Sequence, residues 1–162
     1  MTVIEELRQC ELFSAVSDGD LAKVASSALE KEYEAGTIIH QEGDDAVELL
    51  VLREGKVAIQ MALPTERGQM ARRITVDVVT KNEVVGWSAI VEPYVYAFSV
   101  VSLQNVKALS ISGTKLRALI QNDPKVGYEM LKGLIKVVAS RLNEARRVLV
   151  SERLLTTKTG IE

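Results

Sequence analysis

The chain has 162 residues, of which 47% are hydrophobic and 26% charged, and its formal net charge is −2. A chain of this length buries about 70% of the surface that its unfolded form exposes, so it can hold a core without disulfides or metal. The isoelectric point near 5.6 and the absence of a basic stripe argue against direct DNA binding. One histidine and one cysteine are too few for a histidine-rich metal site or a histidine-based catalytic dyad, so we expect neither a metal nor an enzyme.

The N-terminus does not resemble a signal peptide, because acidic residues follow its first four positions directly. No apolar run approaches the ~18 residues that a membrane span requires. We therefore expect a cytoplasmic protein without membrane contact. Cys10 lies among apolar residues and is predicted to be a small buried hydrophobe rather than a reactive thiol. His40 is predicted to lie on the surface at the end of a strand.

Two helical segments are predicted in residues 1–31. Thr2 and Glu5 have the spacing of a capping box, which predicts a short first helix. A second helix is predicted to start at Ser17 and to end near Lys31. Its apolar positions follow the period of one helix face: Leu21, Val24, Ala25, Ala28 and Leu29.

The period changes in residues 32–111, where glycines separate short runs rich in β-branched residues. Such runs at this spacing predict strands of a small antiparallel roll. The predicted strands cover residues 37–40, 49–52, 56–61, 74–79, 97–102 and 106–111. Residues 63–71 are predicted to form the exposed tip of a hairpin.

Helical character returns in residues 112–155. Ser112 is predicted to cap a helix that stops at Asn122, and Pro124 suits the first position of a long helix reaching about Arg153. Residues 156–162 are predicted to be a loose polar tail. The fold class is therefore α+β: a jelly-roll-like antiparallel double-stranded β-roll, flanked by N-terminal helices and a long C-terminal helix, in a single domain.

The long helix carries two apolar stripes. The first is a seam with alternating spacings of four and three, which predicts a homodimer: Leu131, Ile135, Val138, Leu142, Ala145 and Leu149. The second, beside it, gives way to Arg141 and Glu144 and consists of Met130, Leu134 and Val137. We expect the first half to lie between the roll and a partner helix, and the second half to contact only the partner. The alternative is that the helix simply packs on its own domain.

The order of parts, and several motifs, resemble the cyclic-nucleotide-binding domain. The motifs begin at Leu12-Phe13 and include Glu42-Gly43-Asp44 and Gly55-Lys56-Val57. The resemblance covers about residues 12–150 and implies a regulatory roll that senses a ligand. In regulators of the catabolite-activator type a winged helix follows. Nine residues follow Arg153, whereas such a module needs on the order of 50, so we expect a stand-alone form without DNA binding.

The family's phosphate-binding cassette is a Gly-Glu pair, a short helix, and then an Arg before Ala and Thr. There the helix amides and the Arg meet the cyclic phosphate, and the Glu binds the ribose. Here Gly86 matches, but Trp87 stands at the Glu and Tyr96 at the Arg. Losing two charge-assisted contacts would weaken binding about 10²- to 10⁴-fold, so we expect no tight binding of cyclic AMP in the usual pose.

The remaining candidate site is an amide-lined pocket at the altered cassette. Its predicted ligand-binding residues are Gly86, Trp87, Ser88, Ala89, Tyr96, Ala97 and Ser99. Two alternatives stay open for the aromatic cluster of Trp87, Tyr94, Tyr96 and Phe98: it fills the space of a lost ligand as core or dimer packing, or it lines a pocket for a flat or hydrophobic ligand. If the cluster fills the space, the protein is a ligand-free dimeric scaffold. If it lines a pocket, the protein is a dimeric sensor of a cyclic nucleotide or another small anionic or flat ligand, and it signals to a partner protein.

Overall fold

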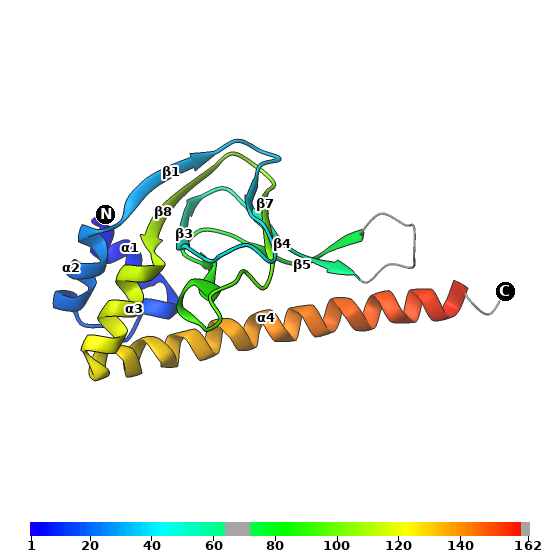
Figure 1. Cartoon of the computed structure of the whole chain (residues 1–162). Coiled ribbons are helices and arrows are strands. Elements are labelled where there is room, and N and C mark those ends of the chain that lie inside the picture. Colours follow the sequence, from blue (N-terminus) through cyan, green and yellow to red (C-terminus); the bar gives the residue numbers. More distant parts are fainter. Residues whose placement is uncertain (64–71, 160–162) are drawn as a thin grey trace.

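Two antiparallel sheets of four strands face each other in the computed structural model, which describes residues 1–63 and 72–159 (Figure 1). One sheet has the order β1-β8-β3-β6 and the other β2-β7-β4-β5. The strands are β1 Leu29–Tyr33, β2 Ile38–His40, β3 Glu48–Glu54, β4 Val57–Leu63, β5 Arg72–Val79, β6 Val84–Val85, β7 Ser99–Ser102 and β8 Val106–Ser112. The predicted antiparallel β-roll is confirmed. Residues 64–71 of the predicted hairpin tip lie outside the described residues.

Three short helices precede the roll: α1 Val3–Gln9, the 3-10 helix η1 Glu11–Phe13, and α2 Asp18–Ser26. The capping box of Thr2 and Glu5 is present. The prediction that the second helix reaches Lys31 is wrong. The hydroxyls of Ser26 and Ser27 donate to carbonyls of the last helical turn, an alternative to continued helix. Residues from Leu29 onward instead pair with β8 as the edge strand β1.

The core consists of two clusters. One lies between the first sheet and the helices and includes Phe13, Leu109 and Met130, each at most 1% exposed. The other fills the interior between the two sheets and includes Leu50, Val76 and Val100. The cassette segment after β6 lies where these two clusters meet, because Ala89 belongs to the first and Val85 to the second.

Two helices follow the roll: α3 Gly113–Asn122, capped by Ser112 as predicted, and α4 Pro124–Thr159. The helix α4 runs beneath the roll and extends past it (Figure 1). It is longer than predicted, because residues 156–159, expected in a loose tail, are helical. None of the described helices is long and apolar enough to span a membrane.

The inner face of α4 packs on the roll over more of its length than predicted. Met130, Leu134 and Val137 are buried as expected. In the second half Arg141 and Ala145 are also buried, at 5% and 8% exposure, and Val148 packs on the core inside the roll. The expectation that this half has only a partner helix is therefore wrong.

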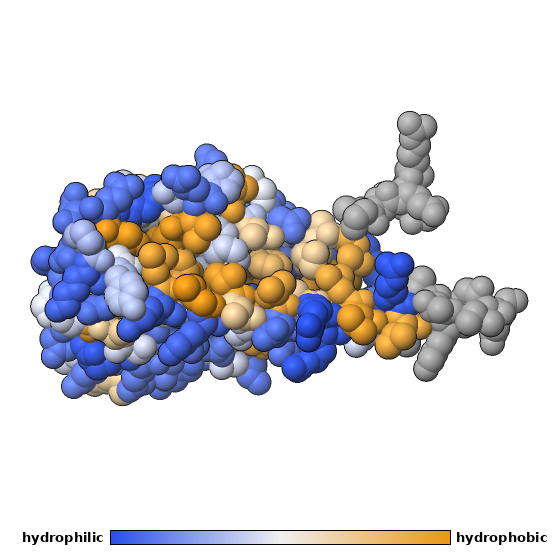
Figure 2. All heavy atoms as spheres, turned by 90° about the horizontal axis from the view of Figure 1, so that it is seen from below, coloured by the Kyte–Doolittle hydropathy of each residue, from blue (hydrophilic) through white to orange (hydrophobic). Residues whose placement is uncertain are grey.

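The outer face of α4 carries an apolar row with a spacing of seven residues. We call it the outer row: Tyr128, Ile135, Leu142 and Leu149, with exposures of 63%, 66%, 67% and 38%. The rest of the predicted dimer seam turns toward the roll: Leu131 is 50% exposed, Val138 packs on the core, and Ala145 is buried. The prediction that Val138 and Ala145 contact a partner helix is therefore wrong. An ideal helix rotates a seven-residue repeat by about 20° per heptad, which carries this part of the seam toward the roll. Seen from below, Figure 2 shows hydrophobic residues along this face of α4.

Candidate functional site

The cassette begins with a sharp turn that only glycine suits. Gly86 follows β6 with φ +83°, in the left-handed region. A Cβ atom at this position would lie 2.8 Å from the carbonyl oxygen of Glu48 and 3.0 Å from Cε1 of His40. Gly86 thus allows the chain to pass closely beneath β3 and β2 before it enters the 3-10 helix η2 Trp87–Ile90.

One of the amides predicted to attract an anion, that of Ala89, already has a partner within the turn. The amide of Ala89 donates to the carbonyl of Gly86 at 3.0 Å. The Ser88 hydroxyl accepts a hydrogen bond from the amide of Ala97 at 3.1 Å, which closes the loop on itself. The cassette therefore satisfies part of its own hydrogen-bonding capacity.

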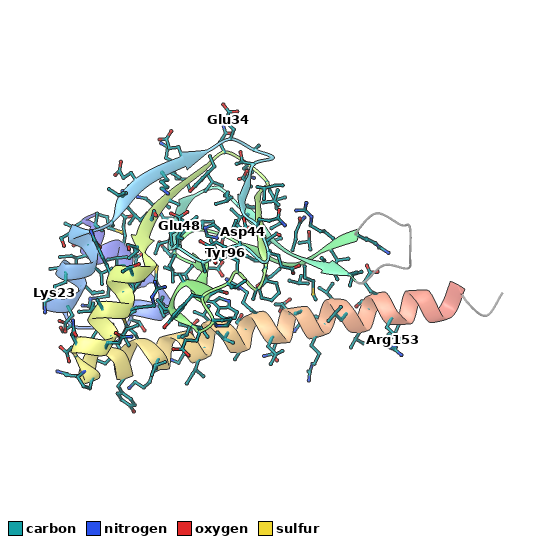
Figure 3. All side chains as sticks on the ribbon, viewed as in Figure 1. Lys23, Glu34, Asp44, Glu48, Tyr96 and Arg153 are labelled. Carbon is teal, nitrogen blue, oxygen red and sulfur yellow. The ribbon has the colours of Figure 1, made fainter. Side chains whose placement is uncertain are left out.

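Tyr96 fills the position that the resemblance assigns to the phosphate-binding arginine. Its hydroxyl donates to the carbonyl of Glu48 at 3.0 Å and accepts from the amide of the same residue at 3.3 Å. The side chain points into the roll beside Glu48 (Figure 3). Burial raises the pKa of Tyr96 to about 12, so the hydroxyl stays protonated at neutral pH.

His40 lies against the ring of Tyr96. The prediction that it lies on the surface is therefore wrong. The two rings are stacked with centroids 4.1 Å apart and an angle of 12° between their planes. His40 is 4% exposed because its strand β2 turns it under Gly86. Its Nε2 lies 3.3 Å from a carboxylate oxygen of Glu48.

Glu48 is the polar centre beneath the cassette. It pairs with Lys31 at 2.8 Å and accepts a hydrogen bond from the Ser110 hydroxyl, in addition to its contact with His40. Burial raises the pKa of Glu48, but the hydrogen bonds from these three side chains outweigh it and lower the pKa to about 2. A charged carboxylate is therefore part of the folded structure at neutral pH.

A cavity of about 20 Å³ remains at the cassette, which is room for about one water molecule. Pockets for small-molecule ligands usually measure about 300–1,000 Å³. Of the predicted ligand-binding residues, the cavity brings together Gly86, Trp87, Ser88, Tyr96 and Ala97. Phe98 of the predicted aromatic cluster also lines it. The side chains that sequence reasoning did not assign to it are His40, Ile59, Val85, Val100 and Arg141.

Two predicted site residues, Ala89 and Ser99, are not among those that line this cavity. Ala89 is fully buried in the core below η2. The Ser99 hydroxyl instead accepts from the amide of Glu42 at 2.9 Å and holds the loop after β2. Of the four clustered aromatics, Tyr94 also lies apart, with its ring 4.2 Å from the guanidinium carbon of Arg117.

Three of the residues missed by sequence reasoning, His40, Ile59 and Arg141, come from segments distant from the cassette. Arg141 did interrupt an apolar stripe of α4, which is a signal that a charge points inward, but its partners are 57 and 64 residues away along the chain. Cys10 was correctly predicted: it is fully buried, and burial, followed by nearby Glu6 and Glu83, raises the pKa of its thiol to about 12. Within residues 1–63 and 72–159, no three His, Cys, Asp or Glu side chains form a metal-binding group.

A two-sheet roll with a glycine-started 3-10 helix and a long following helix defines a cyclic-nucleotide-binding-like regulatory domain. The family model of the cyclic nucleotide-binding domain matches residues 30–123. The chain therefore belongs to the cyclic nucleotide-binding domain family.

Individual relatives agree with this assignment. A crystal structure of a Geobacter metallireducens protein assigned to cyclic nucleotide binding is 27% identical, with a TM-score of 0.73, over 88% of this chain and 99% of that one. The regulatory domain of Toxoplasma gondii protein kinase A, crystallised with cAMP, is 25% identical, with a TM-score of 0.64, over 72% and 42%. A candidate potassium channel protein of Rhodopseudomonas palustris is 25% identical over 119 residues, 74% of this chain and 27% of that one. The chain thus spans about a quarter of that curated relative.

Proposed function

We propose that this domain is a regulatory module that does not bind a cyclic nucleotide in the usual pose. One observation carries the proposal: the pair of Tyr96 and His40 fills the cassette and leaves a cavity of about 20 Å³. Tyr96 is held there by two hydrogen bonds to Glu48, so a ligand of nucleotide size has to displace it. Of the two functions left open by the sequence, this geometry favours the ligand-free scaffold over a sensor of another small anionic or flat ligand.

In this proposal α4 is the element through which the domain binds other proteins. The outer row and Leu131 form an apolar face on a helix that already packs on its own roll along the opposite side. We propose that a second copy packs along this face, because the seven-residue spacing is that of paired helices. A partner protein would then recognise the dimer. The domain acts in this proposal by binding and not by catalysis.

Isothermal titration calorimetry with cyclic AMP, cyclic GMP and the corresponding non-cyclic nucleotides tests the first part. We expect no saturable heat at ligand concentrations up to about 1 mM, and no rise in the melting temperature, because a bound ligand would stabilise the fold. The Toxoplasma domain crystallised with cAMP serves as the positive control. Saturable binding of any of these ligands at micromolar concentration overturns the proposal.

Light scattering coupled to size-exclusion chromatography tests the second part. The unmodified chain is expected to elute with the mass of a dimer, and Ile135→Glu and Leu142→Glu are expected to elute as monomers. Lys136→Glu, which introduces the same acidic side chain at an exposed position beside the outer row, is the control and should remain dimeric. A monomeric mass for the unmodified chain at micromolar concentration excludes the dimer.

A further inference from the structure

One buried arginine connects α4 to both sheets of the roll. Arg141 is 5% exposed. Its Nη1 donates to a carboxylate oxygen of Asp77 in β5 at 2.7 Å, and its Nη2 donates to the carbonyl of Val84 in β6 at 3.1 Å. The strands β5 and β6 belong to different sheets, so a single guanidinium joins three elements.

The contact lies at the edge of the cassette. Val84 is two residues before Gly86, and Arg141 itself lines the small cavity together with His40 and Tyr96. The side chains of Arg141 and Asp77 are only 6% and 17% exposed. Solvent and salt therefore screen this ion pair much less than the ion pairs on the surface.

The next residue along the helix points into solvent. Leu142 is 67% exposed and belongs to the outer row. Because Arg141 and Leu142 are consecutive in one rigid helix, the direction of Arg141 sets the direction in which the outer row points. Ala145, one turn later, contributes only a methyl group to the packing against the roll.

We propose that Arg141 is a positioning residue that pins α4 to the roll without any ligand. In this arrangement the Asp77 carboxylate and the Val84 carbonyl fix the rotation and height of α4 on the roll. The outer row is thereby held in one orientation toward a second copy. We call the contacts of Arg141 with Asp77 and Val84 the pin. The pin itself does not depend on the proposed function; only the orientation of the outer row toward a second copy rests on that proposal.

The distance between α4 and the roll tests the pin. Nitroxide labels on Lys56→Cys and Arg147→Cys, both at exposed positions, report this distance by double electron–electron resonance in a Cys10→Ala background. Labelled chains are diluted with unlabelled chains so that only distances within one chain are measured. A narrow distribution is expected for the otherwise unmodified protein.

Arg141→Met keeps an unbranched apolar side chain but removes the guanidinium, and with it the contacts to Asp77 and Val84. We expect a clearly broader distance distribution and a dimer dissociation constant raised at least tenfold, while β3 and β8 keep their protection from hydrogen exchange. Arg146→Met, which removes an exposed guanidinium from the same helix, is the matched control and should leave the distribution narrow. Equal widths for the two variants overturn the proposal.

Asp77→Asn gives a second, milder test if Arg141→Met does not fold. It keeps the shape of the side chain and removes the charge that Arg141 pairs with. The distance distribution should therefore become broader, as in Arg141→Met. An unchanged distribution in Asp77→Asn overturns the proposal. If the unmodified chain is monomeric but Arg141→Met still broadens the distance, the dimer fails and the pin stands.

Discussion

The Tyr96 hydroxyl is hydrogen-bonded to both the carbonyl and the amide of Glu48, at 3.0 and 3.3 Å. A tyrosine whose hydroxyl satisfies both the amide and the carbonyl of one residue in β3 has a structural role inside the roll. The side chain of Glu48 contributes on the same side, through its contact with His40. The cassette is thus hydrogen-bonded to β3 through Tyr96, and β3 to β2 through Glu48 and His40.

Tyr96→Phe should destabilise the fold without changing its shape. The ring and its stacking on His40 remain, but the buried backbone groups of Glu48 lose their partner. We expect the free energy of unfolding to fall by about 1–3 kcal/mol, measured by urea denaturation. Tyr94→Phe, whose ring stays against Arg117, is the control and should change stability by less than about 0.5 kcal/mol. Equal effects of the two variants would contradict the role assigned to Tyr96.

Gly86→Ala should be more harmful than an ordinary surface change. An alanine here would have to adopt a positive φ, and its Cβ would lie 2.8 Å from a backbone oxygen. We therefore expect a loss of about 3 kcal/mol in the free energy of unfolding. Gly19→Ala in α2 is the matched control, since nothing lies within 4 Å of its Cβ position. It should raise stability by up to about 1 kcal/mol, because alanine favours the helix. Thermal denaturation of both variants measures the difference, and a harmless Gly86→Ala would exclude the close approach.

Glu48 should make stability depend on pH in the acid range. Its pKa is about 2 in the folded state and near 4.5 in an unfolded chain, so the unfolded state binds the proton first. The stabilisation is complete above about pH 4.5 and is lost as the pH falls toward 2; it amounts to about 3 kcal/mol.

The variant Glu48→Gln should be less stable at pH 7 and should lose less stability on acidification than the unmodified chain. Urea denaturation at pH 7, 4 and 3 measures both effects. Glu54→Gln is the control, because that carboxylate is exposed and its ion pair with Lys107 measures 3.7 Å. If Glu54→Gln and Glu48→Gln have the same pH profile, Glu48 is not the group responsible.

Gly133→Ala should disturb the docking of α4 on η1. A Cβ at Gly133 would lie 2.5 Å from the carbonyl oxygen of Leu12 and 2.6 Å from that of Glu11, so the two helices would have to move apart. We expect a net loss of about 2 kcal/mol in spite of the better helix propensity of alanine. Lys136→Ala, exposed on the same helix, is expected to change stability by no more than about 0.5 kcal/mol. Chemical denaturation distinguishes these outcomes.

Local patterns predicted the elements well, and contacts between distant segments limited the rest. The roll and the caps at Thr2 and Ser112 follow from spacing and capping chemistry, which neighbouring residues determine. The strand from Leu29 to Tyr33 was missed because its pairing with β8 comes from a segment more than 70 residues later. In the same way, nothing near His40 in the sequence announces that Tyr96 and Gly86 will cover it.

The sequence pattern points to a cassette at Gly86 but does not say whether the space beside it is open or filled. Gly86 identified the cassette, and the substitutions at Trp87 and Tyr96 indicated a lost charge pattern. Whether aromatic side chains fill or line a pocket depends on their rotamers, which tertiary contacts select and a local sequence pattern does not reveal. Arg141 shows the same limit on α4, since its inward direction was suggested by the interrupted stripe but its partners in β5 and β6 were not.

The side chain of Tyr96 is covalently attached to the pocket that it fills. It therefore acts as a competitor whose local concentration is constant, and neither dilution nor dialysis can remove it. Its two hydrogen bonds and its ring stack together are worth about 2–3 kcal/mol, which keeps the open pocket a minor state. Any diffusing ligand that needs this space binds about 30- to 150-fold more weakly than to an open pocket. The first barrier to any ligand in this space is thus the stability of a residue of the protein's own chain.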